Sequence, residues 1–189
     1  MMLMIGTGMI GAGFMQRTST SSPAASRRPG QLELLQAQSG PGALFAYGTL
    51  QFPGVLSALL RRVPEHAVGT AVGWRAAALA ARNYPGMVRA GRATATGILI
   101  TGLTPAEWRL IDTYEDDFYE LRQLTLADGR RGWTYAWVNH AEVAAHDWSA
   151  PDFAARHLAE FTERCRAWRQ RYDTTGQPGH VTGHQWRLR

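Results

Sequence analysis

The sequence has no lysine, a single cysteine and no apolar run of the roughly 20 residues that a membrane helix requires. The lone cysteine, Cys165, cannot form an internal disulfide, which fits a reducing compartment. The apolar start of the chain carries its first positive charge only at Arg17, whereas a secretory signal begins with positive charge. We therefore expect a cytoplasmic protein without a membrane-spanning segment.

The absence of lysine means that all 20 basic residues are arginine, and the 189-residue chain has a net charge of +5. This charge permits attraction to anions. The arginine pairs at 27–28, 61–62 and 130–131 lie in separate segments, however, and no aromatic residues are interleaved with them to stack on bases. We do not expect a nucleic-acid partner and keep it only as an alternative, which predicts binding that weakens steeply with salt.

The sequence lacks the residue patterns that several kinds of catalysis require. Five of the seven serines precede residue 43, which leaves Ser57 and Ser149, and no G-x-S-x-G elbow occurs. Cys165 lies on an apolar helical stripe, where a packed thiol is favoured over a nucleophile. Only His180 and His184 have an i, i+4 spacing, and no C-x-x-C or H-E-x-x-H pattern is present. We expect neither a metal ion nor a cofactor.

The chain divides into an extension, one folded domain and a tail. Residues 1–42 include a Ser/Thr/Pro/Arg-rich stretch that is too polar to order itself, so we expect a disordered N-terminal extension. Within it, residues 5–13 match G-x-G-x-x-G but lack the following helix and acidic residue of a dinucleotide site. The folded domain is predicted at 43–172, with a flexible tail at 173–189.

Turn signals separate short runs of small, branched and aromatic residues from a few helical patterns. This order predicts an α+β fold with a curved antiparallel sheet that can close as a barrel, short inserted helices and an amphipathic C-terminal helix. Glycines within the second strand indicate that it bends, and residues 82–88 are predicted to form a loop. The predicted strands are 43–50, 67–80, 95–103, 118–127 and 132–138, and the predicted helices are 52–62, 104–117 and 150–172.

The helix over 104–117 has a complete start signature. Thr104 is the N-cap, Pro105 the first helical residue, and Glu107 completes a capping box. Its predicted buried stripe consists of Trp108, Leu110, Ile111 and Tyr114.

The stretch "YGTLQFPG" at 47–54 runs from a strand through a glycine turn into a helix start. Such turns point successive backbone N–H groups into one concavity, and the helix N-terminus adds partial positive charge. An α-carboxylate or an oxyanion would suit this place. An ordinary strand-to-helix turn explains the same residues equally well.

Five of the 15 acidic residues fall between Asp112 and Glu120. Among them, Glu115 occupies the last turn of the predicted helix, where the helix dipole disfavours negative charge. Asp112 three residues earlier, the adjacent Asp116 and flanking aromatic residues also raise the expected pKa of Glu115, toward the range of a general base. The alternative is a helix end whose carboxylates all face water.

The stretches "YGTLQFPGVL" (47–56), "YPGMV" (84–88), "TGILITGL" (96–103) and "LIDTYEDDFY" (110–119) occur in this order ahead of the predicted hairpin. Together they resemble the γ-glutamylcyclotransferase-like family, also called AIG2-like. The resemblance implies a small mixed β-barrel with a cavity, a small-molecule γ-glutamyl substrate, and a reaction that needs no metal or cofactor.

The resemblance also implies roles for individual residues. The glycine turn would hold the γ-glutamyl group through backbone groups, and Glu115 would act as the catalytic acid/base. Two positions depart from the family pattern: Thr49 replaces the usual serine, and Asp116 replaces a frequent glycine. The predicted site consists of Glu115 as the catalytic residue and Tyr47, Gly48, Thr49, Leu50, Tyr84 and Tyr119 as substrate-binding residues.

The implied reaction is an attack of the substrate's own α-amine on its γ-glutamyl carbonyl, which releases 5-oxoproline and a free amine. Four aromatic residues are considered for the pocket of the leaving amine, and places in the core explain them as well: Trp74, Tyr84, Tyr135 and Trp137. The alternative function is a non-catalytic module on the same barrel that binds a small ligand or a protein.

Overall fold

The computed structural model describes residues 42–115 and 117–175. All but the last residue of the predicted extension and most of the predicted tail therefore lie outside the described residues, and so does Asp116. In chain order the elements are β1 (Leu44–Ala46), a 3-10 turn (Thr49–Gln51), α2 (Pro53–Leu60), β2 (His66–Leu79), β3 (Gly86–Ile100), α3 (Pro105–Glu115), β4 (Tyr119–Thr125), β5 (Arg131–Trp137), a 3-10 turn (His140–Glu142), β6 (Val143–Asp147), α4 (Ala150–Arg156) and α5 (Leu158–Thr175).

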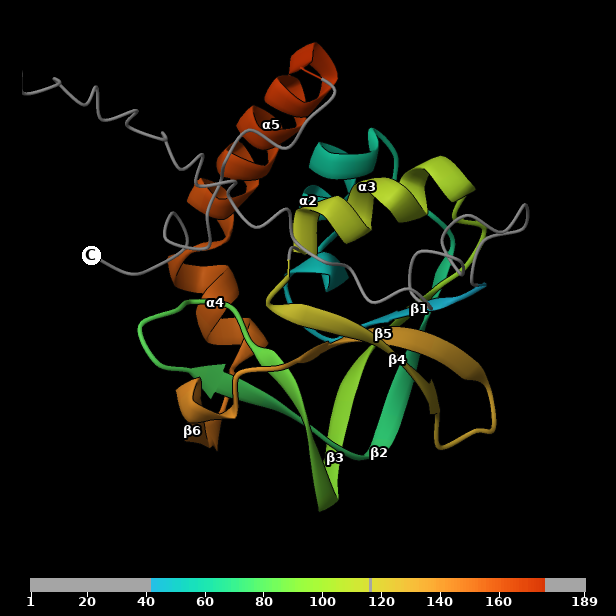
Figure 1. Cartoon of the computed structure of the whole chain (residues 1–189), viewed down its shortest axis with the longest axis vertical. Helices are drawn as coiled ribbons and strands as arrows, with labels where there is room; N and C mark the ends of the chain where they lie inside the picture. Colours follow the sequence, from blue (N-terminus) through green and yellow to red (C-terminus); the bar gives the residue numbers. More distant parts are fainter. Residues whose placement is uncertain (1–41, 116, 176–189) are drawn as a thin grey trace, which may run out of the picture.

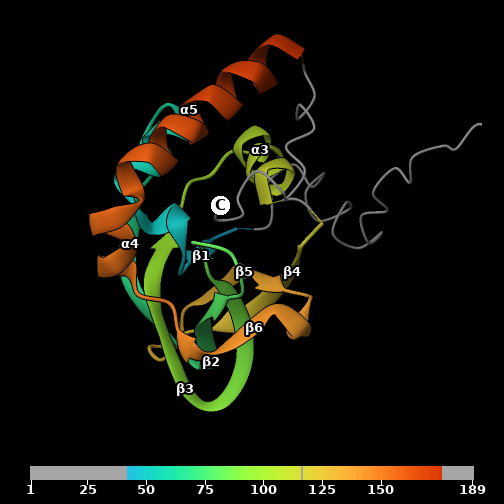
Figure 2. The same ribbon diagram turned by 90° about the vertical axis from the view of Figure 1, so that its left-hand side faces the viewer.

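The strands form one mixed sheet in the order β4-β5-β1-β3-β2-β6, which confirms the α+β class and the mixed sheet that the resemblance implied. The wholly antiparallel sheet expected from the residue pattern is wrong, because one strand pairs in parallel with two others. Strand β5 runs parallel to β1 and β3, and the other pairs are antiparallel. The sheet curls into a half-barrel (Figures 1 and 2). Just beyond β4, Leu126 bridges Ala71 of β2, and the Ala127 N–H donates to the Thr70 carbonyl at 2.8 Å. These contacts bring the chain after β4 back onto the sheet.

The second and third strands form a long antiparallel pair. Strand β2 bends at Gly73, as predicted, because a register shift between Val72 and Trp74 coincides with a φ of 79° at that glycine. Strand β3 begins at Gly86, so the predicted loop is wrong for residues 86–88. Gly86 pairs with Ala77 and packs so closely on Trp137 that an added Cβ would lie 2.7 Å from the Trp137 Cβ.

Two predictions near the C-terminus need correction. The single helix predicted over 150–172 is two helices that meet at His157, whose φ of −130° interrupts the helical backbone. Helix α5 then continues to Thr175, past the predicted domain boundary at residue 172. The sequence does not predict strand β6 ("VAAHD"), because it is short and mostly exposed. Among the described residues it pairs with β2 alone, at the edge of the sheet.

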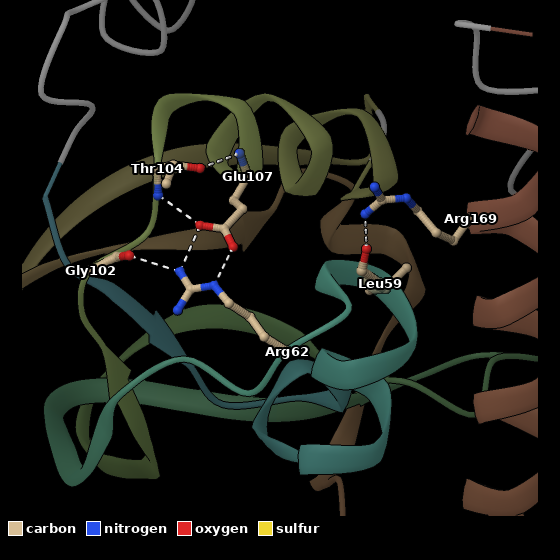
Figure 3. Close-up of polar contacts among 6 residues, drawn as sticks. All are labelled: Leu59, Arg62, Gly102, Thr104, Glu107 and Arg169. Carbon is tan, nitrogen blue, oxygen red and sulfur yellow. Dashed lines mark hydrogen bonds and ion pairs between the residues drawn. The ribbon is translucent and has the colours of Figure 1, made fainter. Parts of the chain in front are cut away.

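Helices α2, α3 and α5 lie on one side of the sheet (Figures 1 and 2). The main hydrophobic cluster joins them to β1, where Leu44 and Ala46 are buried, and Trp108 of α3 is fully buried in it. Arg169 of α5 also donates a hydrogen bond to the Leu59 carbonyl near the end of α2 (Figure 3). This packing fixes the helix that follows the glycine turn and the helix that ends at Glu115.

Candidate active site

The glycine turn lies at the end of β1. Its 3-10 hydrogen bonds run from the Gln51 N–H to the Gly48 carbonyl at 3.1 Å and from the Phe52 N–H to the Thr49 carbonyl at 3.3 Å. The turn packs against Pro85, because a Cβ added to Gly48 would lie 2.9 Å from the Pro85 Cγ. Any larger residue at position 48 would push the turn and the proline apart.

The side chains of the turn point into the protein. Thr49 and Leu50 are buried, and Leu50 belongs to the hydrophobic cluster beneath the helices. The Tyr47 hydroxyl is also buried, donates to the Tyr135 carbonyl at 2.8 Å and accepts from the Met87 N–H at 2.9 Å. Because these side chains are buried, backbone groups are what this turn can offer a ligand.

Three of the resembling stretches meet at Pro85. Its ring contacts Gly48 of the first stretch, and its carbonyl accepts a hydrogen bond from the Tyr119 hydroxyl at 2.9 Å. Met87, two residues later, holds Tyr47 through the bond described above. The segments 47–50 and 84–88 and the residue Tyr119 are far apart in sequence, and these contacts bring them together.

Glu115 is the last residue of α3 and is partly buried. Burial is the main cause that raises the pKa of four surrounding tyrosines, and the negative charge of Glu115 adds to each shift. Its carboxylate therefore lies close enough to these phenols to affect their ionisation. The four residues are Tyr47, Tyr84, Tyr114 and Tyr119.

The pKa of Glu115 is raised to about 8. Withdrawal of its carboxyl from water is the larger cause, and the charge of Asp112 is the second. Asp112 is itself buried and accepts a hydrogen bond from the Tyr135 hydroxyl at 3.3 Å. A carboxyl with this pKa can both accept and release a proton near neutral pH.

The start of α3 is held by a hydrogen-bonded clamp (Figure 3). The predicted capping box is confirmed: the Thr104 N–H donates to the Glu107 Oε2 at 2.8 Å, and the Glu107 N–H donates to the Thr104 hydroxyl at 3.2 Å. Arg62, just after α2, donates to both carboxylate oxygens of Glu107 and to the Gly102 carbonyl. This clamp ties the helix after the glycine turn to the helix that carries Glu115.

One charged residue of this region was missed in the sequence. Arg82 is buried beneath the aromatic residues, forms an ion pair with Glu142 and donates to the Tyr84 hydroxyl. Its only sequence signal is its place two residues before the tyrosine of "YPGMV". A surface position would be the ordinary expectation for an arginine there.

Two further residues of the acidic cluster have other surroundings. Asp117 is exposed, and Glu120 forms an ion pair with Arg122. Within residues 42–115 and 117–175, no three His, Cys, Asp or Glu side chains are grouped as a metal site would require. No helix in this part of the chain is long and apolar enough to cross a membrane.

The same fold occurs in two solved structures from Arabidopsis thaliana. One solution structure superposes with a TM-score of 0.52 at 22% identity, and the match covers 71% of this chain and 86% of the Arabidopsis chain. A second solution structure superposes with a TM-score of 0.50 at 24% identity, and the match covers 72% of this chain and 94% of the second Arabidopsis chain. These similarities define the class of fold.

Residues 44–150 match the model of the family described as "Gamma-glutamyl cyclotransferase, AIG2-like". The chain belongs to this family, and the resemblance seen in the four stretches is confirmed. Two curated relatives, both from Arabidopsis thaliana, are named AIG2-like protein C and AIG2-like protein B. The first is 34% identical over 101 residues, which make up 51% of this chain and 59% of the relative. The second is 27% identical over 126 residues, which make up 64% of this chain and 73% of the relative. This chain thus spans about three fifths of the length of AIG2-like protein C.

Proposed function

We propose that this protein is a γ-glutamyl cyclotransferase that converts a γ-glutamyl amine or γ-glutamyl amino acid into 5-oxoproline and a free amine. The observation that carries the proposal is the partly buried Glu115 carboxyl, whose pKa is about 8, among tyrosines that include Tyr47 of the glycine turn. Membership of the cyclotransferase family supports the same reaction class. The lone cysteine, Cys165, is buried and forms no disulfide, in keeping with the cytoplasm as the proposed compartment.

In the first step the substrate's α-amine attacks its own γ-carbonyl carbon, and a five-membered ring forms. Nucleophile and electrophile belong to one molecule, so the protein needs to hold the folded conformer rather than collect two reactants. The amine must lose a proton to attack. An α-amine has a pKa of about 8, close to that of Glu115, so transfer of this proton to the Glu115 carboxylate is nearly balanced in free energy.

In the second step the tetrahedral intermediate expels the other nitrogen. An amine anion is a poor leaving group, so the nitrogen must receive a proton as its bond to carbon breaks. Glu115, protonated in the first step, supplies that proton and returns to the carboxylate. The nitrogen of the new ring still carries two hydrogens and a positive charge, and it passes one of them to the Glu115 carboxylate, which gives it to the released amine as an ammonium ion. One carboxyl group therefore relays both protons that the substrate's ammonium group loses.

The glycine turn is proposed to stabilise the negative oxygen of the intermediate. The first N–H groups of a helix have no partner within the helix, and the chain from Gly48 to Leu50 leads directly into a 3-10 turn and α2. Each such donor contributes roughly 3 kcal/mol to the transition state in comparable sites. The close packing of Gly48 on Pro85 would keep these donors in place.

The tyrosines are proposed to bound the substrate rather than to transfer protons. The Tyr119 hydroxyl is bonded to the Pro85 carbonyl, so its ring is what remains to contact a ligand. Tyr84 is buried in the same hydrophobic cluster, and we propose that it lines the side of the leaving amine. The cavity that these residues would line stays a prediction.

The proposal is tested by incubating the purified protein with a panel of γ-glutamyl compounds and measuring 5-oxoproline. Glu115→Gln keeps the size of the side chain but cannot transfer a proton, and turnover should fall by about 100-fold or more. Asp117→Asn, an exposed acid two residues away, is the matched control and should stay within about twofold. Undiminished turnover in Glu115→Gln would refute the mechanism. Thermal stabilisation by a compound that is never converted would indicate the binding module instead.

A further inference from the structure

Arg82 is the buried cation of the region beside the candidate site. Its side chain is 1% exposed, and its Nε lies 2.8 Å from the Oε2 of Glu142, whose side chain is 21% exposed. Burying an ion pair withdraws both charges from water, which is unfavourable unless further contacts satisfy the groups. The other contacts of Arg82 therefore indicate what this arrangement does.

Three aromatic rings surround the guanidinium. Its central carbon lies 4.9 Å from the ring centre of Phe118, 5.0 Å from that of Trp137 and 5.6 Å from that of Tyr84. Phe118 and Trp137 also stack on each other at 5.7 Å, and Tyr119 packs edge-on against Trp137 at 5.0 Å. Arg82 thus contacts a cluster of aromatic rings, called here the aromatic wall, that consists of Tyr84, Phe118, Tyr119 and Trp137. Two of these residues, Tyr84 and Tyr119, are predicted substrate-binding residues.

The polar contact of Arg82 with this wall is specific. Its Nη1 donates to the hydroxyl oxygen of Tyr84. A phenol oxygen that accepts from a guanidinium keeps its own O–H as a donor, and the direction of that O–H is restricted by the bond it accepts. Tyr84 directly precedes Pro85, on which the glycine turn and Tyr119 converge.

We propose that Arg82 is a positioning residue: anchored by Glu142, it orients the Tyr84 hydroxyl as a hydrogen-bond donor to an oxygen of the bound γ-glutamyl substrate. The role rests on the proposed function for the identity of the ligand. The role requires arginine, because one planar group must donate from Nε to Glu142, donate from Nη1 to Tyr84 and stack on rings. Lysine has a single charged nitrogen and cannot make all of these contacts.

Steady-state kinetics give the first test. A hydrogen bond that is equally strong in the bound substrate and in the transition state affects KM and leaves kcat unchanged. Tyr84→Phe and Arg82→Met should each raise KM about tenfold with kcat within about twofold, and Arg82→Lys should fall between them and the wild type. The double variant Tyr84→Phe/Arg82→Met should have a KM no higher than that of either single variant. A purely structural defect would lower kcat through loss of folded enzyme, and additive losses in the double variant would overturn the proposal.

A paired substitution guards against misfolding. Arg82→Met alone removes the ion pair between Arg82 and Glu142 but keeps the glutamate charge, whereas Arg82→Met combined with Glu142→Leu removes both charges. The pair should fold and still show the raised KM, and a wild-type KM in the folded pair would refute the positioning role. The matched control is Arg130→Met, which breaks an arginine–aspartate contact in the exposed β4–β5 turn and should leave KM unchanged.

A spectroscopic readout without substrate separates this proposal from the proposed function. In protein labelled with ¹³C at the tyrosine Cζ, the Tyr84 resonance is assigned by its loss in Tyr84→Phe. The chemical shift of this resonance should change in Arg82→Met, and in Arg82→Lys it should lie between the values of Arg82→Met and the wild type. An unmoved resonance would refute the positioning role. Failure of every γ-glutamyl compound to react would refute the proposed function and leave the spectroscopic result to decide the role of Arg82.

Discussion

The two ends of helix α3 carry glutamates in opposite electrostatic states. At the start, the hydrogen bond from Arg62 and the contacts with Thr104 hold the pKa of Glu107 below its ordinary value. At the end, withdrawal from water and the charge of Asp112 raise the pKa of Glu115 to about 8. The first carboxylate is kept ionised and stabilises the helix. The second is near the balance between its two forms, which suits proton transfer.

The helix dipole would lower the pKa of Glu107 and raise that of Glu115, but it is too small to explain the difference between their two pKa values. It contributes at most about 1 kcal/mol at an exposed helix end, less than one pKa unit. The rise of the Glu115 pKa from 4.5 to about 8 is several times larger. Neighbouring groups and burial therefore set the pKa of each glutamate, and substitutions can change the two pKa values separately.

The largest expected effect is on the pH dependence of turnover. The proposed active form holds one proton between the substrate amine and Glu115, and both groups have pKa values of about 8. kcat/KM should therefore rise about eightfold from pH 6 to pH 7 and about threefold from pH 7 to pH 8, roughly 25-fold in all, and decline at higher pH when that proton is lost. The measurement is initial-rate kinetics across pH 5.5–10. A flat profile over this range would contradict the state assigned to the end of α3.

The next effect is on stability, at the start of α3. Glu107→Ala removes the contacts with Arg62 and with the Thr104 N–H, and the free energy of unfolding at pH 7 should fall by about 2 kcal/mol. Because the folded pKa of Glu107 is lowered, its contribution is present above the unfolded pKa and is lost as the pH falls through the folded value. The loss measured by urea unfolding should thus be smaller at pH 3 than at pH 7.

A matched control for that substitution is Glu160→Ala on α5. Glu160 is highly exposed and lies 3.6 Å from Arg164 in an i, i+4 pair. Such pairs contribute about 0.5 kcal/mol or less. Equal losses at the two positions would mean that the clamp on α3 is no stronger than an ordinary surface pair.

Glu115→Gln should have the opposite effect on stability. Its folded pKa lies above the unfolded value, so the folded state loses stability relative to the unfolded chain as pH rises from the unfolded pKa toward about 8. Glutamine removes this penalty, and each kcal/mol recovered should raise Tm by about 4 °C at pH 8, with no gain at pH 4. Calorimetry at both pH values measures the effect. A lower Tm at pH 8 would show that the carboxylate stabilises the site.

The smallest expected effect separates the two causes of the Glu115 shift. Asp112→Asn keeps the size of the side chain and an oxygen that can accept from Tyr135, but removes the charge. The acid limb of the pH profile should move to lower pH, by less than half of the total shift because burial is the larger cause. Tyr135→Phe removes the hydrogen bond and keeps the charge, so it is the control. An unmoved limb in Asp112→Asn would assign the shift to burial alone.

Much of the local structure could be predicted because it depends on neighbours in sequence. The start of α3 follows from Thr104, Pro105 and Glu107, whose side chains satisfy the backbone groups of their own first turn. The bend of β2 follows from Gly73, which adopts a positive φ. The length of β3 and the break at His157 could not be predicted this way. They depend on pairing with β2 and on the packing of two helices.

The sequence by itself determined the glycine turn and the place of Glu115 at a helix end, because turn and capping signals act over a few residues. Only the tertiary structure decided that the glycine turn and Tyr119 meet at Pro85, that Asp112 is buried, and that Arg82 is enclosed by aromatic rings. Those contacts join residues tens of positions apart, and burial depends on what the whole fold packs over a side chain. The raised pKa of Glu115 follows mainly from that burial, which the local sequence does not contain.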